Sequence, residues 1–257
     1  MNRVLVTMAA AAMFAGCASV QEKCQCDCAY CGCGGLPPVC TEAEIAEGFT
    51  PLFDGETLKN WVPLKSGCYQ VAKGGILEYR PDLGGGSLWT EKEYSDFCLR
   101  FDFKLTCDCN NGLAVRCPKA NLNTYTGGFE IQMIDDEGSM YKDVFPQLGL
   151  HHHPYQRHGA VYGVVPPKVQ ENGKSYLKPV GQWNDQEVTM VGSHLKVVLN
   201  GHVIQDVDLD QYPIDQSTMD HTPHPGIRSR KGCFAWLSHG YPCYWKNIRI
   251  KEVKSEK

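Results

Sequence analysis

The chain has 257 residues, of which 42% are apolar and 21% charged, and its formal net charge is −4. This composition excludes a largely disordered chain, and the weak negative charge argues against a nucleic-acid-binding protein, which needs a basic surface. Cysteine is the unusual feature, because seven of the 14 cysteines fall within the first 40 residues. The length is sufficient for one large domain or two small ones.

Residues 1–16 have the pattern of a secretory signal peptide. Arg3 supplies the positive charge, and the apolar run from Val4 to Phe14 is too short to span a bilayer. The small residues before Cys17 resemble a bacterial lipobox, although Phe14 replaces the usual leucine. We expect export to the cell envelope, lipidation at Cys17 and membrane attachment through the lipid alone. The alternative is an ordinary signal peptide with a chance cysteine.

Residues 17–47 read as a cysteine-rich tether. The run from Cys24 to Cys33 lacks the periodic apolar residues that a core requires. Closely spaced thiolates attract soft metals, but the C-x-C spacing differs from the C-x2-C pair of a zinc knuckle. Local disulfides or a stalk near the cell surface are favoured over a metal site. Residues Thr41–Glu47 predict a short helical turn.

Residues 48–254 predict an all-β domain. Five apolar residues alternate along Phe97–Leu105, and Asn200-Gly201 is a strong hairpin signal. No helix-period segment of ten or more residues intervenes, so a jelly-roll β-sandwich of two antiparallel sheets is expected. The predicted strands are Tyr69–Val71, Ile76–Tyr79, Ser87–Trp89, Phe97–Leu105, Gly112–Val115, Phe129–Met133, Glu187–Val191, His194–Leu199, His202–Asp208, Cys233–Ser238 and Tyr244–Val253.

The strand rhythm weakens between Asp135 and Gly181. This stretch contains clustered histidines, several prolines and four aromatic residues that are candidates for a binding surface. A loop of this length within a compact domain is usually functional or disordered. The aromatic residues and histidines favour a functional loop.

Three constellations carry groups suited to chemistry. The first places Glu130 and Gln132 on one face of a strand, near Asp135 and with Arg116 to neutralise the carboxylate. A solvated sheet face is the alternative. The second contains His151, His152, His153 and His158, which could bind a transition metal or form a polar loop. The third combines Trp183-Asn184 with His239-Gly240, where the indole could stack on a sugar.

Several well-known catalytic motifs are absent. The sequence has no P-loop, dinucleotide-binding glycine fingerprint, HExxH or GxSxG motif. Nucleotide-dependent and serine-hydrolase chemistry are therefore disfavoured, and no nucleotide partner is expected.

A set of motifs, in order over about 200 residues, resembles the 3-keto-disaccharide hydrolase family. The resemblance implies a concanavalin A-like jelly roll that acts on glycosides oxidised at sugar C3. Leu237 stands where the family often has Gln, and the domain cysteines are additional. The motifs lie in Phe49–Trp61, Leu88–Thr90, Tyr94–Phe97, Asn110–Arg116, Gly128–Asp135, Gly159–Gly163, Lys178–Asn184, Leu199–Gly201, Ser238–Gly240 and Lys246–Ile248.

The chemistry that the resemblance implies starts with a ketone at C3, which acidifies the hydrogen on C2. A base removes this proton, the group on C1 leaves, and water adds back. The reaction needs a base, an acid and a group that stabilises the oxyanion. The predicted catalytic residues are Glu130 with His153 or His239 as acid and base, Arg116 as the oxyanion-stabilising group, and Tyr162 as a proton donor.

The sugar-binding and cofactor predictions follow from the same resemblance. The substrate-binding candidates are Gln132, Asp135, Lys178, Trp183 and Asn184. A divalent metal that bridges Glu130, Asp135 or a histidine is an open possibility. Glu130 and Asp135 could also act as the carboxylate pair of a standard glycosidase.

Two other functions remain open, a non-catalytic lectin-like domain and a structural or partner-binding surface protein built around the cysteine-rich segment. Seven cysteines fall within the domain, and we expect them to reinforce loop ends as disulfides. Because seven is odd, at least one stays free or pairs outside the domain. These residues are Cys68, Cys98, Cys107, Cys109, Cys117, Cys233 and Cys243.

Overall fold

The computed structural model describes residues 38–64 and 67–253. The predicted signal peptide, Cys17 and the tether up to residue 37 lie outside the described residues. The predicted helical turn is confirmed as α2 (Glu42–Ala46), where the Thr41 side chain and Glu44 form a capping box. No helix in the described ranges is long and apolar enough to cross a membrane.

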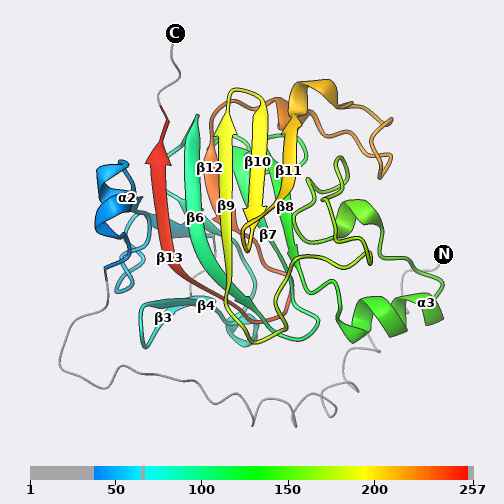
Figure 1. The fold of residues 1–257 in the computed structure, drawn as a ribbon, viewed down its shortest axis with the longest axis horizontal. Coiled ribbons are helices and arrows are strands. Elements are labelled where there is room, and N and C mark those ends of the chain that lie inside the picture. The colour runs from blue at the N-terminus through cyan, green and yellow to red at the C-terminus, as the bar shows by residue number, and fades with distance from the viewer. Residues whose placement is uncertain (1–37, 65–66, 254–257) are drawn as a thin grey trace. The chain divides into compact units, whose positions relative to one another are not determined.

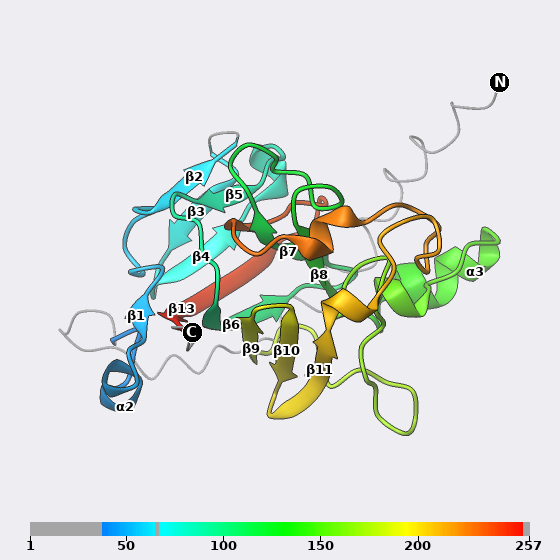
Figure 2. The ribbon, with the colours of Figure 1, turned by 90° about the horizontal axis from the view of Figure 1, so that it is seen from above.

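Two antiparallel sheets form the described domain, which confirms the predicted jelly-roll sandwich (Figures 1 and 2). The larger sheet has the order β11-β10-β9-β6-β13-β4-β3, with β1 paired to β13, and the smaller has the order β2-β5-β12-β7-β8. The strands are β1 (Thr50–Pro51), β2 (Trp61–Pro63), β3 (Tyr69–Ala72), β4 (Ile76–Tyr79), β5 (Leu88–Thr90), β6 (Phe97–Leu105), β7 (Asn110–Cys117), β8 (Phe129–Ile134), β9 (Asn184–Val191), β10 (His194–Leu199), β11 (His202–Asp208), β12 (Cys233–Trp236) and β13 (Cys243–Glu252).

Every predicted strand is present, with its ends shifted by no more than a few residues. The sequence patterns missed β1 and β2, because strands of two and three residues are too short to show alternation. The Asn200-Gly201 hairpin is also confirmed. Both residues have positive φ, at 50° and 81°, as a type I′ turn between β10 and β11 requires.

The core lies between the two sheets. Along β6, the alternate residues from Phe97 to Leu105 are buried, as the pattern predicted. Trp236 of the smaller sheet stacks on Trp245 of the larger sheet, with ring centroids 4.8 Å apart. Alternate residues of β7 and β8 also belong to this core. The residues between them point to the outer face of the smaller sheet.

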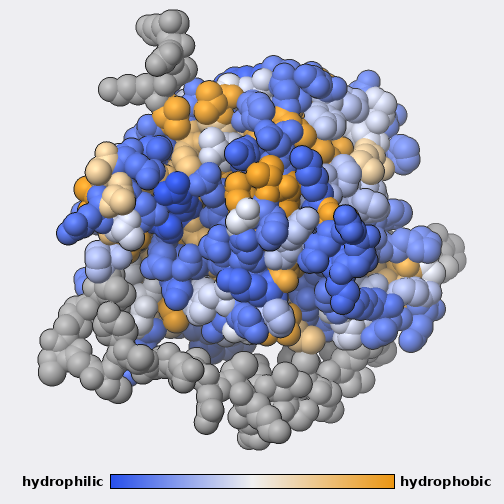
Figure 3. Space-filling view, viewed as in Figure 1, coloured by the Kyte–Doolittle hydropathy of each residue, from blue (hydrophilic) through white to orange (hydrophobic). Residues whose placement is uncertain are grey.

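The outer face of the larger sheet is solvated. Figure 3 shows this side of the molecule, which is largely hydrophilic with small apolar patches. Arg100, Asp102 and Lys104 alternate with the core residues of β6 and are only partly buried. This face is an ordinary charged sheet surface.

The long stretch after β8 covers the edge of the smaller sheet. Gln132 N donates to Ala160 O, Gly159 N donates to Gln132 O, and Tyr162 N donates to Glu130 O. These bonds pair backbone N–H and C=O groups at the outer edge of β8. All six residues of the strand are buried. The stretch also holds a π-helical turn (Met140–Val144), α3 (Phe145–Gln147) and a 3₁₀ turn (Pro154–Gln156). Further 3₁₀ turns are Pro81–Leu83, Leu209–Gln211 and Pro225–Arg228.

The expected disulfides at loop ends are not formed by six of the described cysteines. Their thiols are free and buried, although Cys117 and Cys233 occupy opposite positions on β7 and β12. Burial is therefore how these side chains contribute to the fold, as small apolar groups. The six are Cys40, Cys98, Cys109, Cys117, Cys233 and Cys243.

Candidate active site

A cavity of about 380 Å³ lies on the outer face of the smaller sheet. Its floor is formed by β7 and β8, and its walls come from the segments around Tyr125, Ser238 and the long stretch after β8. The lining residues are Ser87, Asn110, Thr124, Tyr125, Glu130, Gln132, Ile134, Tyr141, Phe145, His152, Gln156, Tyr162, Leu237, Ser238 and His239. A concave site with a few convergent polar groups is the usual form of a small-molecule site.

Small residues on β7 hollow out the floor of this cavity. Gly112 lies opposite Gln132 in the strand register, and Ala114 lies opposite Glu130. A Cβ atom on Gly112 would come within 2.0 Å of Oε1 of Glu130. The Glu130 carboxyl group therefore occupies the space above Gly112, which only glycine leaves open.

Glu130 is the most perturbed acid of the cavity. Its side chain is buried, its Oε1 atom has no hydrogen-bond partner among the described residues, and burial raises its pKa to about 8. The carboxyl group consequently keeps its proton at neutral pH and can donate it. Oδ1 of Asn110, on the same face of the sheet, is also buried without a partner in the described part of the chain. Two buried oxygens in this cavity are thus available for hydrogen bonds with a ligand.

His152 supplies a neutral imidazole to the same cavity. Its Nε2 atom lies 3.3 Å from the carbonyl oxygen of Gln156 and 3.7 Å from a carboxylate oxygen of the buried Asp136. A carbonyl only accepts, so Nε2 carries the hydrogen and Nδ1 keeps a lone pair. Burial lowers the pKa of His152 and also that of His239, the second histidine in the lining. Both rings are therefore able to accept a proton at neutral pH.

Two tyrosines face the cavity as hydrogen-bond donors. Nε2 of Gln156 donates to Oη of Tyr162 at 3.2 Å, which fixes the phenol and leaves its O–H free to donate. Burial raises the pKa of Tyr125 to about 12, so this phenol also keeps its proton. The two rings meet edge to face, with centroids 6.4 Å apart.

The structure brings four of the predicted site residues together, Glu130, Gln132, Tyr162 and His239. The alternative of a solvated sheet face does not hold for Glu130 and Gln132, because both are buried under the long stretch. This stretch contributes Tyr141, Phe145, His152, Gln156 and Tyr162 to the lining.

Arg116 does not reach the cavity. Its φ of 52° breaks the alternation at the end of β7, and the guanidinium group turns toward the loop before β6. There it donates to Ser95 O and Gly192 O and forms a 2.9 Å ion pair with Asp96. All of its nitrogen atoms bond to these loops, so Arg116 connects them and is not placed to stabilise an oxyanion.

His153 also lies outside the lining, and its neighbour His152 takes the place expected for it. The His153 ring is exposed and stacks on Tyr155, with centroids 5.0 Å apart. The ring centroids of His151 and His153 lie 6.1 Å apart, outside the lining, and only His152 of the three faces the cavity, which the sequence cannot distinguish. His158 is a core residue, buried against Phe103 and hydrogen bonded to Gln186.

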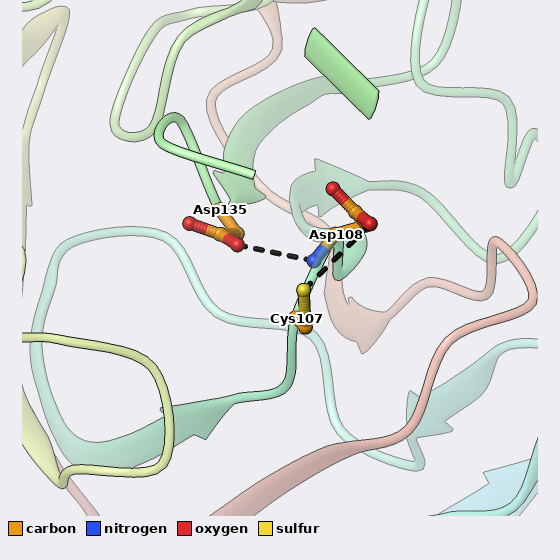
Figure 4. Close-up of side chains that lie close together, drawn as sticks. All are labelled: Cys107, Asp108 and Asp135. Atoms are coloured by element: carbon orange, nitrogen blue, oxygen red, sulfur yellow. Dashed lines mark hydrogen bonds between the residues drawn. The ribbon is translucent and has the colours of Figure 1, made fainter. Parts of the chain in front are cut away.

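Asp135 belongs to a small cluster with Cys107 and Asp108, whose candidate ligand atoms lie within 4.8 Å of one another (Figure 4). Each carboxylate oxygen already accepts a hydrogen bond. Asp135 accepts from the backbone N–H of Asp108 and Glu137, and Asp108 accepts from Ser139 Oγ and Met140 N. These bonds explain the cluster as a connection between two loops, so we assign no catalytic step to a metal there.

Asn184 begins β9 in the larger sheet, and Lys178 and Trp183 lie in the segment that leads into it; none of the three lines the cavity. The Trp183 ring packs against the Nζ atoms of Lys104 and Lys246, and Lys178 Nζ donates to Trp183 O. Asn184 is buried, and its side-chain oxygen accepts from Lys178 N. These contacts order the entry into β9.

The sequence patterns missed Asn110, Tyr125, Gln156 and Ser238, and did not distinguish His152 from its neighbours. Tyr125 and Ser238 lie in loops, where no periodicity predicts which side chain faces a cavity. The available signals were the motifs Asn110–Arg116 and Ser238–Gly240 and, for Gln156 and His152, the concentration of aromatic residues and histidines after β8.

Comparison with known proteins places this geometry in context. Residues 48–251 match the family described as 3-keto-alpha-glucoside-1,2-lyase-like domain. The chain is also similar to two solved structures from Parabacteroides distasonis, both provisionally described as glycosyl hydrolases. One is 25% identical with a TM-score of 0.65, and the alignment covers 80% of this chain and 99% of that one. The other is 23% identical with a TM-score of 0.65, covering 84% and 98%. No curated protein matches the chain.

Proposed function

The chain belongs to the family of 3-keto-alpha-glucoside-1,2-lyase-like domains, and from this we propose that its cavity cleaves glycosides whose sugar carries a ketone at C3. At a coarser level, the family and the similar structures support a glycoside-acting or carbohydrate-binding function. The observation that carries the proposal is the protonated carboxyl group of Glu130, whose Oε1 has no partner among the described residues, in one cavity with two neutral histidines.

The proposed reaction begins with the hydrogen on C2, which the C3 ketone makes acidic. Nδ1 of His152 accepts this proton, and the electron pair of the C2–H bond forms an enolate. As the enolate returns to the ketone, its electron pair forms the C1–C2 double bond and the C1–O bond breaks. Glu130 donates its proton to the departing oxygen, so an alcohol leaves. Addition of water across the double bond completes a net hydrolysis.

The side chains available for the enolate oxygen are neutral hydrogen-bond donors. Among the described residues that line the cavity there is no lysine or arginine. We assign the role to the phenols of Tyr125, whose pKa burial raises to about 12, and of Tyr162, which Gln156 holds in place. Preorganised donors in a site shielded from water stabilise developing charge strongly.

The test is incubation of the full-length protein with an aryl 3-keto-glucoside and with the unoxidised glucoside, each with and without a chelator. We expect release of the aryl alcohol from the oxidised substrate alone, and unchanged rates with the chelator. Release from the unoxidised glucoside would indicate ordinary glycosidase chemistry. Binding of both sugars without release from either would overturn the enzymatic proposal and favour a lectin-like domain.

We also propose that the protein is exported and attached to the membrane through a lipid on Cys17. The support is the sequence of residues 1–17, with its positive charge, short apolar run and small residues before the cysteine. An enzyme anchored at the cell envelope would meet extracellular or periplasmic glycosides.

A further inference from the structure

Four rings form a continuous series along one side of the cavity, which we call the aromatic wall: Tyr125, Tyr162, Tyr155 and His153. The ring centroids are 6.4 Å apart for Tyr125 and Tyr162, 6.3 Å for Tyr162 and Tyr155, and 5.0 Å for Tyr155 and His153. The first two contacts are edge to face, and the third is a parallel stack at 5°. The four rings therefore form one connected aromatic cluster, in which each ring supports the next.

The wall extends beyond the cavity itself. Tyr125 and Tyr162 belong to the lining, whereas Tyr155 and His153 do not. Tyr155 is half-buried and His153 is exposed, so part of both rings faces solvent. The cavity, at about 380 Å³, lies near the lower end of small-molecule sites, so a substrate with a large leaving group would extend past it.

The two halves of the wall are held together by one side chain. Gln156 donates from Nε2 to Tyr162 Oη, while its Oε1 accepts from the backbone N–H of His153 at 3.0 Å. The outer rings therefore have a fixed position relative to the inner rings. A binding surface that is already ordered loses little entropy when a ligand binds.

The inner end of the wall is also fixed. His224 is buried, stacks on Tyr125 with centroids 4.6 Å apart, and bonds through Nε2 to Asp220 at 3.0 Å. A Cβ atom on Gly163, directly after Tyr162, would lie 2.4 Å from Nε2 of His224. This close packing locks Tyr125 and Tyr162 against each other.

We propose that Tyr155 and His153 form a second subsite, which binds the group that leaves from C1 and favours a flat ring, either a sugar or an aryl group. This inference rests on the proposed function for the assignment of the leaving group. Aromatic faces pack on the C–H face of a pyranose or on another aromatic ring. A methyl leaving group would be too small to reach the outer rings.

The test compares kcat/KM for three 3-keto-glucosides that differ only at C1: a methyl glycoside, a phenyl glycoside and a disaccharide. The Tyr155→Ala and His153→Ala variants should lose about tenfold in kcat/KM for the two ring-bearing substrates and less than twofold for the methyl glycoside. The Tyr155→Phe variant keeps the ring and should therefore retain the preference for the two ring-bearing substrates over the methyl glycoside.

Tyr176 and His202 provide matched controls. They form a similar tyrosine–histidine stack, with centroids 4.2 Å apart, but do not line the cavity. Their alanine variants should change all three rates equally, if at all. An equal loss across the three substrates in Tyr155→Ala would overturn the subsite, and so would the absence of any loss.

Failure of the proposed function is distinguishable from failure of the subsite. If the unmodified protein cleaves none of the substrates, the proposed reaction is wrong. Titration calorimetry with the unreactive disaccharide and with methyl glucoside then decides the subsite. Tighter binding of the disaccharide that is lost in Tyr155→Ala supports the second subsite. Equal affinities for the two sugars overturn it.

Discussion

Glu130 combines two properties that are seldom found together in a structural residue, burial and an oxygen without a partner in the described part of the chain. An unpartnered polar group in the interior lowers the free energy of unfolding, and sites that keep one usually do so for function. The Glu130→Gln variant should therefore lose at least a hundredfold in kcat for the 3-keto-glucoside. The exposed Glu56→Gln variant is the control. Unchanged turnover in Glu130→Gln would remove Glu130 from the mechanism.

The same residue predicts a pH dependence of stability. The pKa of Glu130 is about 8 in the folded state and near 4.5 in the unfolded state. Between these values the unfolded chain gives up the proton and the folded protein keeps it, so the free energy of unfolding falls as the pH rises. The Glu130→Gln variant has no titrating group at this position, so its free energy of unfolding lacks this fall. Urea unfolding at pH 5 and pH 8 should show a larger stabilisation of the variant at pH 8, and equal differences at the two values would contradict the assigned pKa.

Gly112 determines where the Glu130 carboxyl group lies. The Gly112→Ala variant would place a methyl group 2.0 Å from the present position of Oε1, and the flexible end of Glu130 would have to move. We expect a loss of roughly tenfold to a hundredfold in kcat, because small displacements of a catalytic group are costly. Near-UV circular dichroism should show a retained fold. Full activity in this variant would mean that the position of the carboxyl group is unimportant.

At the level of elements, α2 is joined to the outer face of the larger sheet through Glu44. Oε1 of Glu44 accepts from Arg249 at 2.7 Å and from Arg100 at 3.3 Å, and Oε2 accepts from Thr41 N in the capping box. Despite burial, which acts in the opposite direction, the bonds from Thr41 and Arg249 lower the pKa of Glu44 to about 2. One carboxylate therefore caps the helix and docks it to β6 and β13 (Figure 1).

Replacement of Glu44 should weaken this junction. The Glu44→Gln variant should lower the free energy of unfolding by about 1–2 kcal/mol at pH 7, and Glu42→Gln, an exposed position in the same turn, should have little effect. Because the folded pKa is depressed, the contribution is present above pH 4.5 and is lost as the pH falls toward 2. Denaturant unfolding at pH 7 and pH 3 measures the difference. An equal difference in the free energy of unfolding at pH 7 and pH 3 would contradict the carboxylate's role.

The stretch between β8 and β9 illustrates how an element without regular structure can build a site. It bonds to the edge of β8 through Gly159–Tyr162 and also supplies a cavity wall. The aromatic residues and histidines of this stretch predicted a functional role for it. Which of them face the cavity depends on the bonds to β8, and no local pattern records these bonds.

At the scale of the whole molecule, the two sheets have different tasks. The larger sheet presents an ordinary charged surface, and the smaller sheet supports the cavity. Figure 2 shows the sheets as two layers, so the cavity and the outer surface of the larger sheet lie on opposite sides of the core. Asn184 lies in the larger sheet, and Lys178 and Trp183 lie in the segment that leads into it, which explains why they are not part of the site.

The predicted lipid anchor belongs to this scale as well. Expression of the full chain in a bacterial host with labelled palmitate should give a labelled protein in the membrane fraction. The Cys17→Ser variant should lose the label while it keeps the turnover of the 3-keto-glucoside, because Cys17 lies outside the domain that holds the cavity. Equal labelling of the two proteins would exclude Cys17 as the attachment point.

The sequence by itself determined the longer strands, the hairpin and the antiparallel class, because each depends on local alternation or on a turn residue that has few alternatives. It also predicted as site residues Glu130, Gln132, Tyr162 and His239, which lie in strands or in motifs of the resembled family and which the structure places in one cavity. Only the tertiary structure decided between His152 and His153 and removed Arg116 from the site. Those outcomes depend on contacts between segments far apart in the chain. The Arg116 side chain is directed by Ser95, Gly192 and Asp96, and His152 by Gln156 and Asp136.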